Sequence, residues 1–215
     1  MLHQTEPCDV LEAMARRHSV REFRPDPVPD AMLLALLEAA HQAPSANNHQ
    51  PWEFVLVRRP ETKAALAAAT SGRNAQVVQT AGASVVCLAS LRQADALADR
   101  IEAQVKAGQA PPEREAMVKR LREDQLHRQM LVLPNTYTAV GFMLLAATKF
   151  GLATLWMTGF DGEKVKEAVG VPADDYLFAG VVAVGHAAEG WTQPPRNRRP
   201  LEEIYYFERF GRREP

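Results

Sequence analysis

The segment 135–150, NTYTAVGFMLLAATKF, constrains the fold more than any other part of the chain. It predicts a helix that is apolar on nearly every face, with small residues among the large ones, and Gly151 is expected to end it. A helix of this kind has to be covered on all sides. We therefore expect it either at the centre of the core or at an interface between subunits.

Helical and strand-like segments alternate along the rest of the chain. Apolar and β-branched runs predict strands at 52–58, 82–90, 152–158 and 176–186. Helical spacing predicts helices at 9–17, 29–43, 61–70 and 161–170, with Asp9, Asp30 and Asp161 as N-caps of three of them and Pro44 just beyond the second. This order allows either a parallel α/β sheet or an α+β sandwich.

Residues 92–130 differ from their surroundings in composition. They read as two charged helices separated by Pro111 and Pro112. One interpretation is a pair of solvated helices, and the other is a lid or a partner-binding insertion, since long excursions are often functional. We expect a single domain over 1–215, with this stretch as a helical insertion.

Overall composition excludes several classes of protein. With 47% apolar residues and a net charge of −1, the chain can build a core but has no general attraction for nucleic acid. Cys8 and Cys87 form no disulfide framework, and Cys87 lies in an apolar run that predicts packing rather than reactivity. We see no signal segment and no window of about 18 apolar residues, so we expect a cytoplasmic protein with no membrane contact.

The common sequence marks of several site types are also missing. The chain has no GxGxxG, GxxxxGK[ST], HExxH, CxxC or GxSxG motif. The usual dinucleotide, phosphate-loop, metal and serine-hydrolase interpretations therefore lose their support, and we predict no metal site.

Two short basic stretches stand at opposite ends of the chain, RHSVREF at 17–23 and PPRNRRP at 194–200. Arginine offers a planar fork of donors that suits phosphate oxygens, and in an extended segment Arg17, Ser19 and Arg21 share one face. Taken alone, each stretch is equally well explained as solvated surface. We predict instead that both hold one phosphate-bearing cofactor.

A polar loop within 43–57, APSANNHQPWEFVLV, joins an expected helix to an expected strand. Around Ser45, Asn47 and Asn48 it has few regular hydrogen bonds of its own, and Gln50 adds another amide. Such groups can pair with a planar polar ligand. The alternative is an ordinary polar turn between helix and strand.

Together these stretches resemble the nitroreductase family of flavin enzymes. The resemblance is carried by RHSVREF, by APSANNHQPWEFVLV, by GLATLWMTGF at 151–160 and by PPRNRRPLEEIYYF at 194–207. It covers most of the chain from 10 to 207, and the order and spacing of the elements agree. It implies a nitroreductase-like α+β fold, with a mostly antiparallel sheet wrapped by helices, in an intertwined homodimer.

The resemblance also implies FMN at the subunit interface. Arg17 and Ser19 would hold its phosphate and ribityl region, Arg21 would lie by the pyrimidine edge, and the loop would come from the other subunit. The expected cofactor-binding residues are Arg17, His18, Ser19, Arg21, Pro44, Ser45, Ala46, Asn48, Gln50, Asn74, Thr158, Gly159, Arg196 and Arg198.

FMN would carry the chemistry, so no side chain is expected to be catalytic. The implied activity takes a hydride from NAD(P)H and passes it to a nitroaromatic, quinone or enone by a ping-pong mechanism. Arg21 would stabilise the charge of the reduced ring, and Trp156 and Phe160 are either core or the ceiling of the acceptor site.

One departure concerns the acceptor. Many relatives have Pro-x-Glu-Gly where this chain has Trp156-Met157-Thr158-Gly159, which affects the shape of the site. Alternative functions are a reductive dehalogenase or flavin-degrading enzyme on the same fold, and a non-catalytic flavin-binding protein. A further alternative is a helical interaction protein that uses 92–130 as its partner surface.

Overall fold

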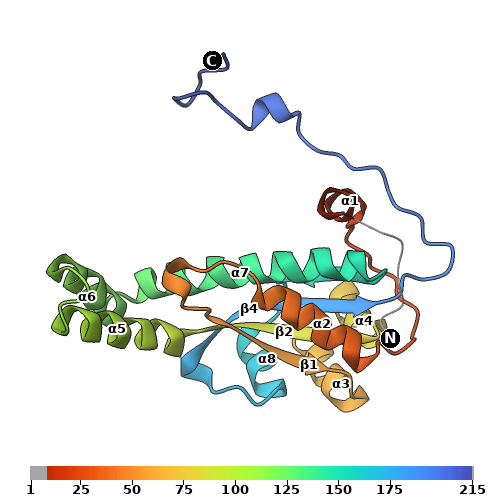
Figure 1. Ribbon diagram of the computed structural model, residues 1–215. Helices are drawn as coiled ribbons and strands as arrows, with labels where there is room; N and C mark the ends of the chain where they lie inside the picture. Colours follow the sequence, from red (N-terminus) through yellow and green to blue (C-terminus); the bar gives the residue numbers. More distant parts are fainter. Residues whose placement is uncertain (1–8, 215) are drawn as a thin grey trace.

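The computed structural model describes residues 9–214 (Figure 1), and Cys8 lies outside them. Its strands are β1 (Trp52–Val57), β2 (Ala83–Ser90), β3 (Ala153–Met157) and β4 (Tyr176–Gly185). Its helices are α1 (Val10–Arg16), α2 (Asp30–His41), α3 (Pro60–Ala68), α4 (Gly72–Thr80), α5 (Leu91–Lys106), α6 (Glu115–Glu123), α7 (Gln125–Lys149) and α8 (Gly162–Ala168). Short 3₁₀ helices are η1 (Ala46–Asn48), η2 (Pro112–Arg114), η3 (Ala173–Asp175) and η4 (Leu201–Glu203).

The strands form one sheet in the order β1-β2-β4-β3, and each neighbouring pair runs antiparallel. The predicted α+β class is therefore confirmed, and the parallel α/β alternative is wrong. The register shifts between Cys87 and Leu88, where β4 has one extra residue before Gly180. Gly180 has a φ of 129° beneath the Trp156 indole, so a Cβ would come within 2.3 Å of the ring nitrogen.

Helices cover both faces of the sheet, α2 and α7 on one and α3, α4 and α8 on the other (Figure 1). Consecutive residues of a strand point to opposite faces, and β2 shows the consequence. Val85 packs in one apolar cluster with Leu36 of α2 and Met143 of α7. Val86 packs in the other with Leu66 of α3. The continuous apolar run of β2 is explained by this double burial.

The apolar helix is longer than predicted. α7 begins at Gln125 rather than Asn135, with Asp124 as its N-cap accepting from the His127 N–H at 2.9 Å, and it continues through the exposed Pro134. A proline inside a helix costs one backbone bond, and here the packing of the rest of α7 outweighs that cost. The stop at Gly151, with a φ of 71°, is confirmed.

Burial of α7 on every side is not found within one chain. Met143 and Ala147 are fully buried, but Tyr137 is 38% exposed and Phe142 40% exposed. Of the two predicted settings, the core and a subunit interface, the core accounts for the burial of one face of α7. The face with Tyr137 and Phe142 stays uncovered.

By length and composition alone, α7 also meets the requirements of a membrane-spanning helix, with a hydropathy of 1.5. We expected no window of about 18 apolar residues, and α7 has polar residues such as Asn135 and Thr136 among its apolar ones. A helix between a sheet and a neighbouring helix has the same composition, and that is where α7 lies.

Residues 92–130 form more pieces than predicted. α5 is the first charged helix, but the second is divided at Asp124 into α6 and the first turns of α7. These pieces bury a cluster of their own, in which Leu97, Ile101 and Leu121 are at most 2% exposed. The stretch is therefore a packed subdomain beyond the end of the sheet rather than a pair of solvated helices.

Two of the three predicted N-caps are found, and one is not. Asp9 and Asp161 cap α1 and α8 as predicted. Asp30 does not cap α2, because the extended Pro29 is the N-cap and the Asp30 carboxylate pairs with Arg58 instead. α4 was not predicted at all. Cys87 is fully buried, as predicted, and burial raises the pKa of its thiol.

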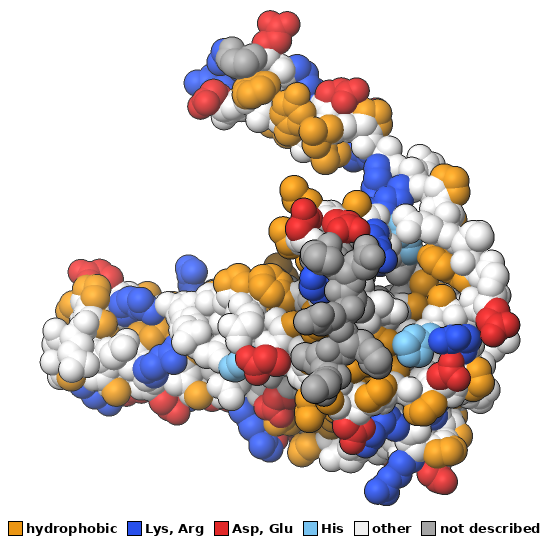
Figure 2. All heavy atoms as spheres, turned by 45° about the vertical axis from the view of Figure 1, so that its right-hand side comes forward, with side chains coloured by type: hydrophobic (Ala, Val, Ile, Leu, Met, Phe, Trp, Pro, Cys, Tyr) orange, Lys and Arg blue, Asp and Glu red, His pale blue; other side chains and the backbone are white. Residues whose placement is uncertain are grey.

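The C-terminal tail leaves the body beyond Arg196 and projects as an arm (Figures 1 and 2). Hydrophobic side chains lie along this arm in Figure 2. Leu201, Ile204 and Phe210 are 68%, 58% and 90% exposed. The arm therefore carries apolar surface that nothing in residues 9–214 covers.

Candidate functional site

The first basic stretch runs as an extended segment beside β3. The Val20 N–H donates to the Thr154 carbonyl at 3.0 Å, and Ser19 forms a parallel bridge with Thr154. Val20 is buried while Ser19 and Arg21 are exposed, so the predicted alternation is found over 19–21, whereas Arg17 and His18 are both half-buried. His18 packs edge-on against Trp191, with ring centres 6.5 Å apart.

The second basic stretch folds back onto the first. The Arg196 guanidinium donates from Nη2 to the Met14 carbonyl at 2.8 Å and to the Arg17 carbonyl, and its Nε lies 3.4 Å from His18 Nε2. These carbonyls belong to the C-terminal end of α1, where a cation is favourable. Residues from the two ends of the chain are thus brought together, as predicted.

Positive charge is crowded at this place, which we call the arginine cluster (Arg17, Arg196 and Arg198). Burial lowers the pKa of Arg17, and the charges of Arg196 and Arg198 lower it further. Within residues 9–214, no carboxylate forms an ion pair with any of the three. Like charges held together without a counterion are unfavourable, so the cluster is suited to an anion.

A second group of predicted residues meets beyond the end of β3. The Gly159 carbonyl accepts from Thr70 Oγ1 at 2.6 Å and from Asn74 Nδ2 at 3.5 Å. α4 presents Asn74 here, so the missed helix is what positions this predicted residue. The Gly159 N–H has no hydrogen-bond acceptor within residues 9–214 and is available to a ligand.

Arg21 lies between the two groups. Its Nη1 donates to the Ser19 carbonyl at 3.2 Å, and its side chain borders a shallow hollow with Arg73 and Gln76 of α4. β3 leads from Thr154, beside Ser19, to Thr158, a length of about 13 Å. The arginine cluster, Arg21 and Gly159 therefore follow one edge of the molecule in order.

The polar loop at 44–50 has an unusual backbone. Asn47, Asn48 and Gln50 have φ values of 52°, 52° and 45°. Ser45 Oγ accepts from the Gln50 N–H at 3.0 Å, and Gln50 Nε2 donates to the carbonyl and Oδ1 of Asn48 at 3.3 and 3.0 Å. The amides predicted to be free for a ligand are thus partly bonded to one another.

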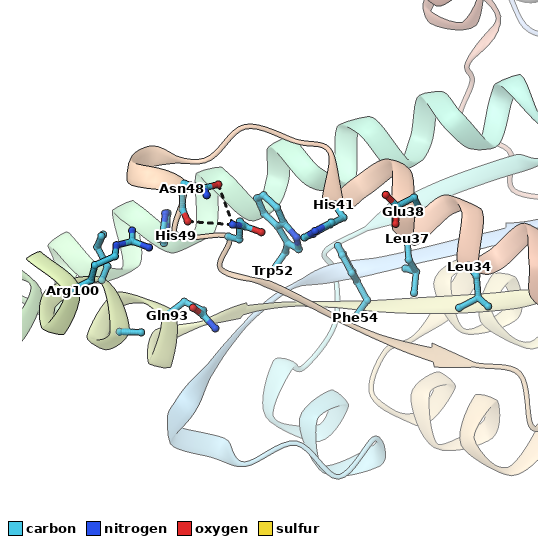
Figure 3. A pocket seen from close by; sticks show the side chains of 13 residues that line it. Leu34, Leu37, Glu38, His41, Asn48, His49, Trp52, Phe54, Gln93 and Arg100 are labelled. Carbon is cyan, nitrogen blue, oxygen red and sulfur yellow. Dashed lines mark hydrogen bonds between the residues drawn. The ribbon is translucent and has the colours of Figure 1, made fainter.

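Beside this loop lies a cavity of about 760 Å³ between α2 and α5 (Figure 3). Trp52, Phe54 and Leu37 line it, with His49 and Arg100 at its end. His49 is 3% exposed, its Nδ1 lies 2.7 Å from the Ala46 carbonyl, and its Nε2 has no partner. Burial lowers the pKa of His49, and Arg100 lowers it further. No sequence motif predicted this cavity.

The loop and the arginine cluster lie far apart within one chain. The Ala46 N–H donates to Asn135 Oδ1 at 2.9 Å, which ties the loop to one part of α7. Thr148, near the other end of α7, borders a hollow with Arg16 and His18. Asn135 and Thr148 are 13 residues apart, about 20 Å along the helix. One chain therefore does not bring both groups onto one small molecule.

The sequence model of the nitroreductase family matches residues 14–186. The chain belongs to the nitroreductase family. The predicted family is thereby confirmed, and the match ends before Arg196 and Arg198.

Two curated relatives of this nitroreductase-family chain are close over nearly their full length. It is 36% identical over 202 residues to a protein of Thermus thermophilus named NADH dehydrogenase, covering 91% of this chain and 94% of the relative. It is 29% identical to the oxygen-insensitive NAD(P)H nitroreductase of Salmonella typhimurium, covering 90% and 97%.

Solved structures agree with the nitroreductase fold. A nitroreductase family protein of Streptococcus pneumoniae is 26% identical and superposes with a TM-score of 0.76, covering 92% of this chain and 98% of that one. A structure from Exiguobacterium sibiricum, described as a nitroreductase in complex with FMN, is 24% identical with a TM-score of 0.77, covering 95% and 99%.

Several residues around these groups were not predicted. Asn135 holds the loop through Ala46, and Arg73 borders the hollow beside Arg21. Arg100 and Arg114 also contact the loop, at Asn47. The only sequence signal of Arg100 and Arg114 is their charge, in a stretch whose composition is that of solvated helices.

Proposed function

We propose that this nitroreductase-family protein is an FMN-dependent oxidoreductase that uses NAD(P)H to reduce a small organic acceptor. The observation that carries the proposal is the arginine cluster, which brings cations from both ends of the chain together, with no carboxylate paired to them in the described part of the chain. The names of the relatives, NADH dehydrogenase and NAD(P)H nitroreductase, support the electron donor. The neighbour that is described as an FMN complex supports the cofactor.

The residues present fit FMN. Arg17, Arg196 and Arg198 supply cationic donors for a dianionic phosphate, and the exposed Ser19 adds a hydroxyl beside Arg17. Each arginine contact neutralises charge that the free protein holds in a crowded state. Phosphate binding therefore relieves a repulsion as well as forming hydrogen bonds.

The ring of the cofactor would lie along the edge from Arg21 to Gly159. Arg21 would place positive charge beside the pyrimidine side, where it would stabilise the negative charge of a reduced ring. The Gly159 N–H would donate to the ring, with Thr158 before it and with Asn74 bonded to the Gly159 carbonyl. FMN, when bound, supplies the acceptance of a hydride from NAD(P)H and its delivery to the acceptor.

A second copy of the chain completes this site in our proposal. Within one chain, the part of α7 that contacts the loop lies about 20 Å from the part beside the cluster. The loop would therefore contact the cofactor of the partner. The exposed face of α7, with Tyr137 and Phe142, and the apolar arm beyond Arg196 are the surfaces a partner would cover. Loop residues Pro44, Ser45, Ala46, Asn48 and Gln50 would border the partner's flavin.

The acceptor is proposed to be a planar nitroaromatic, quinone or enone. Trp156 is 37% exposed and packs at a tilt against Tyr137, with ring centres 5.3 Å apart, so this pair offers an aromatic surface. Phe160 instead packs against the apolar cluster beneath the sheet and contacts Phe178. Of the two aromatics considered for the acceptor site, only Trp156 has the exposure that stacking needs.

The proposal is tested by the visible spectrum of the purified protein. We expect the absorption bands of oxidised flavin, and bleaching of these bands when NADH or NADPH is added without oxygen. Steady-state rates with a quinone should then give parallel double-reciprocal lines, because donor and acceptor use one face in turn. A colourless protein that takes up no FMN would overturn the proposal.

The shared site has its own test. Light scattering should give the mass of a dimer for the flavin-bound protein. A stable flavin-bound monomer would contradict the sharing of the loop while leaving the reaction class untouched.

A further inference from the structure

The loop that carries Asn47 has a backbone that is uncommon for residues other than glycine. Asn47, Asn48 and Gln50 all lie in the left-handed region. Asparagine tolerates this region better than most residues do, and hydrogen bonds among Ser45, Asn48 and Gln50 hold part of the loop. Contacts from outside the loop add to these bonds at Asn47.

Two of these contacts come from the charged helices. Arg100 of α5 donates from Nη2 to the Asn47 carbonyl at 2.5 Å, and Arg114, at the end of η2, donates from Nη2 to Asn47 Oδ1 at 3.0 Å. In Figure 3 the Arg100 side chain extends from α5 toward the loop. Both hydrogen-bonding oxygens of one left-handed residue are thus bound by arginines separated from it by more than 50 positions.

Three other arginines within 92–130 pair with carboxylates, namely Arg92, Arg122 and Arg128. Within residues 9–214, Arg100 and Arg114 form no ion pair, although acidic residues are abundant around them. Their charges are directed to neutral oxygens of the loop.

We propose that Arg100 and Arg114 are positioning residues that clamp the 44–50 loop in its flavin-binding shape, and that residues 92–130 serve this purpose. This inference rests on the proposed function, which places the loop against FMN. It assigns the helical excursion a role inside the site, in contrast to a lid over it or a surface for another protein. The arginines act through Asn47 and need not touch the flavin.

The test is a double-mutant cycle read out as FMN affinity. FMN is titrated into the flavin-free full-length protein and followed by quenching of flavin fluorescence. Arg114→Ala should weaken FMN binding about tenfold, because a charge-assisted hydrogen bond that fixes the loop is lost. Asn47→Gly keeps the left-handed backbone and the carbonyl that Arg100 binds, but removes the Oδ1 that Arg114 binds.

In the Asn47→Gly background, Arg114→Ala should therefore change the affinity by less than about twofold. A merely structural role of Arg114 at the start of α6 would give the same loss in both backgrounds. Arg114→Lys keeps a charged donor and should restore part of the affinity. Arg120→Ala is the matched control, since the exposed Arg120 side chain of α6 has no hydrogen bond or ion pair within residues 9–214.

The outcomes separate the two claims. A wild-type protein that binds FMN, with Arg114→Ala equal to Arg120→Ala, overturns the clamp and leaves the proposed function standing. Equal losses in the two Asn47 backgrounds also overturn it. A wild-type protein that binds no FMN overturns the proposed function, and the clamp with it.

Discussion

Arginines occur in two contrasting settings in this protein. On the charged helices, Arg92, Arg122 and Arg128 each meet an aspartate. At the arginine cluster, Arg196 donates to the Arg17 carbonyl, and the charges of Arg196 and Arg198 act on the Arg17 side chain. No carboxylate forms an ion pair with these three within residues 9–214. The pKa of Arg122 is raised, first by its hydrogen bond to Asp99, whereas the pKa of Arg17 is lowered by burial and by the two other arginines.

The difference between the two settings indicates the roles of these arginine side chains. An exposed arginine paired with a carboxylate is a local arrangement worth about 0–1 kcal/mol. An arginine crowded by its own kind costs stability in the free protein, so its presence requires another explanation. An anionic ligand removes the repulsion and supplies the missing acceptor. Composition does not distinguish the two settings, and geometry does.

The largest expected effect is the loss of FMN affinity when Arg17 of the arginine cluster is replaced. Arg17→Ala removes a charge-assisted phosphate contact worth about 1.5–3 kcal/mol and should weaken FMN binding about ten- to a hundredfold. Isothermal titration of FMN measures it, with Arg122→Ala as the paired-arginine control. Equal affinities in the two variants would mean that the cluster does not hold the phosphate.

A smaller effect concerns His49, which lies near the unpaired Arg100. Burial, and then Arg100, lower the pKa of His49 below its unfolded value near 6.5. The unfolded chain therefore binds the proton more readily, and stability should fall as the pH drops below about 6.5. The melting temperature should fall more between pH 7.5 and 5.5 for wild type than for His49→Gln. Identical pH dependence would refute this account of His49.

The smallest effect is expected for the paired arginine. Arg122→Ala removes an exposed ion pair with Asp99 and should lower stability by no more than about 1 kcal/mol. Denaturant unfolding measures it, and flavin binding should be unchanged. A loss of several kcal/mol would show that the charged helices depend on this pair, which would weaken the contrast between the two settings.

The sequence predicted the antiparallel fold through its resemblance and the strands through their apolar runs. It also predicted the convergence of 17–21 with Arg196, from the two basic stretches at opposite ends of the chain and from the family resemblance. The predicted starts of two helices were wrong. α7 begins ten residues earlier than predicted and contains Pro134, and the N-cap of α2 is Pro29 rather than Asp30.

The rest of the candidate site depends on contacts between distant segments. α4 presents Asn74, and Arg100 and Arg114 reach Asn47 across more than 50 positions. Neither arginine differs in local sequence from the paired arginines around it. Their role follows only from the packing of α5 and α6, which periodicity alone does not give.

The most direct measurement compares the affinities of FMN and riboflavin, which differ only in the phosphate. If the arginine cluster holds the phosphate, FMN should bind the wild-type protein at least about a hundredfold more tightly, and Arg17→Ala combined with Arg196→Ala should remove most of that preference. Equal binding of the two flavins by the wild-type protein would contradict the account.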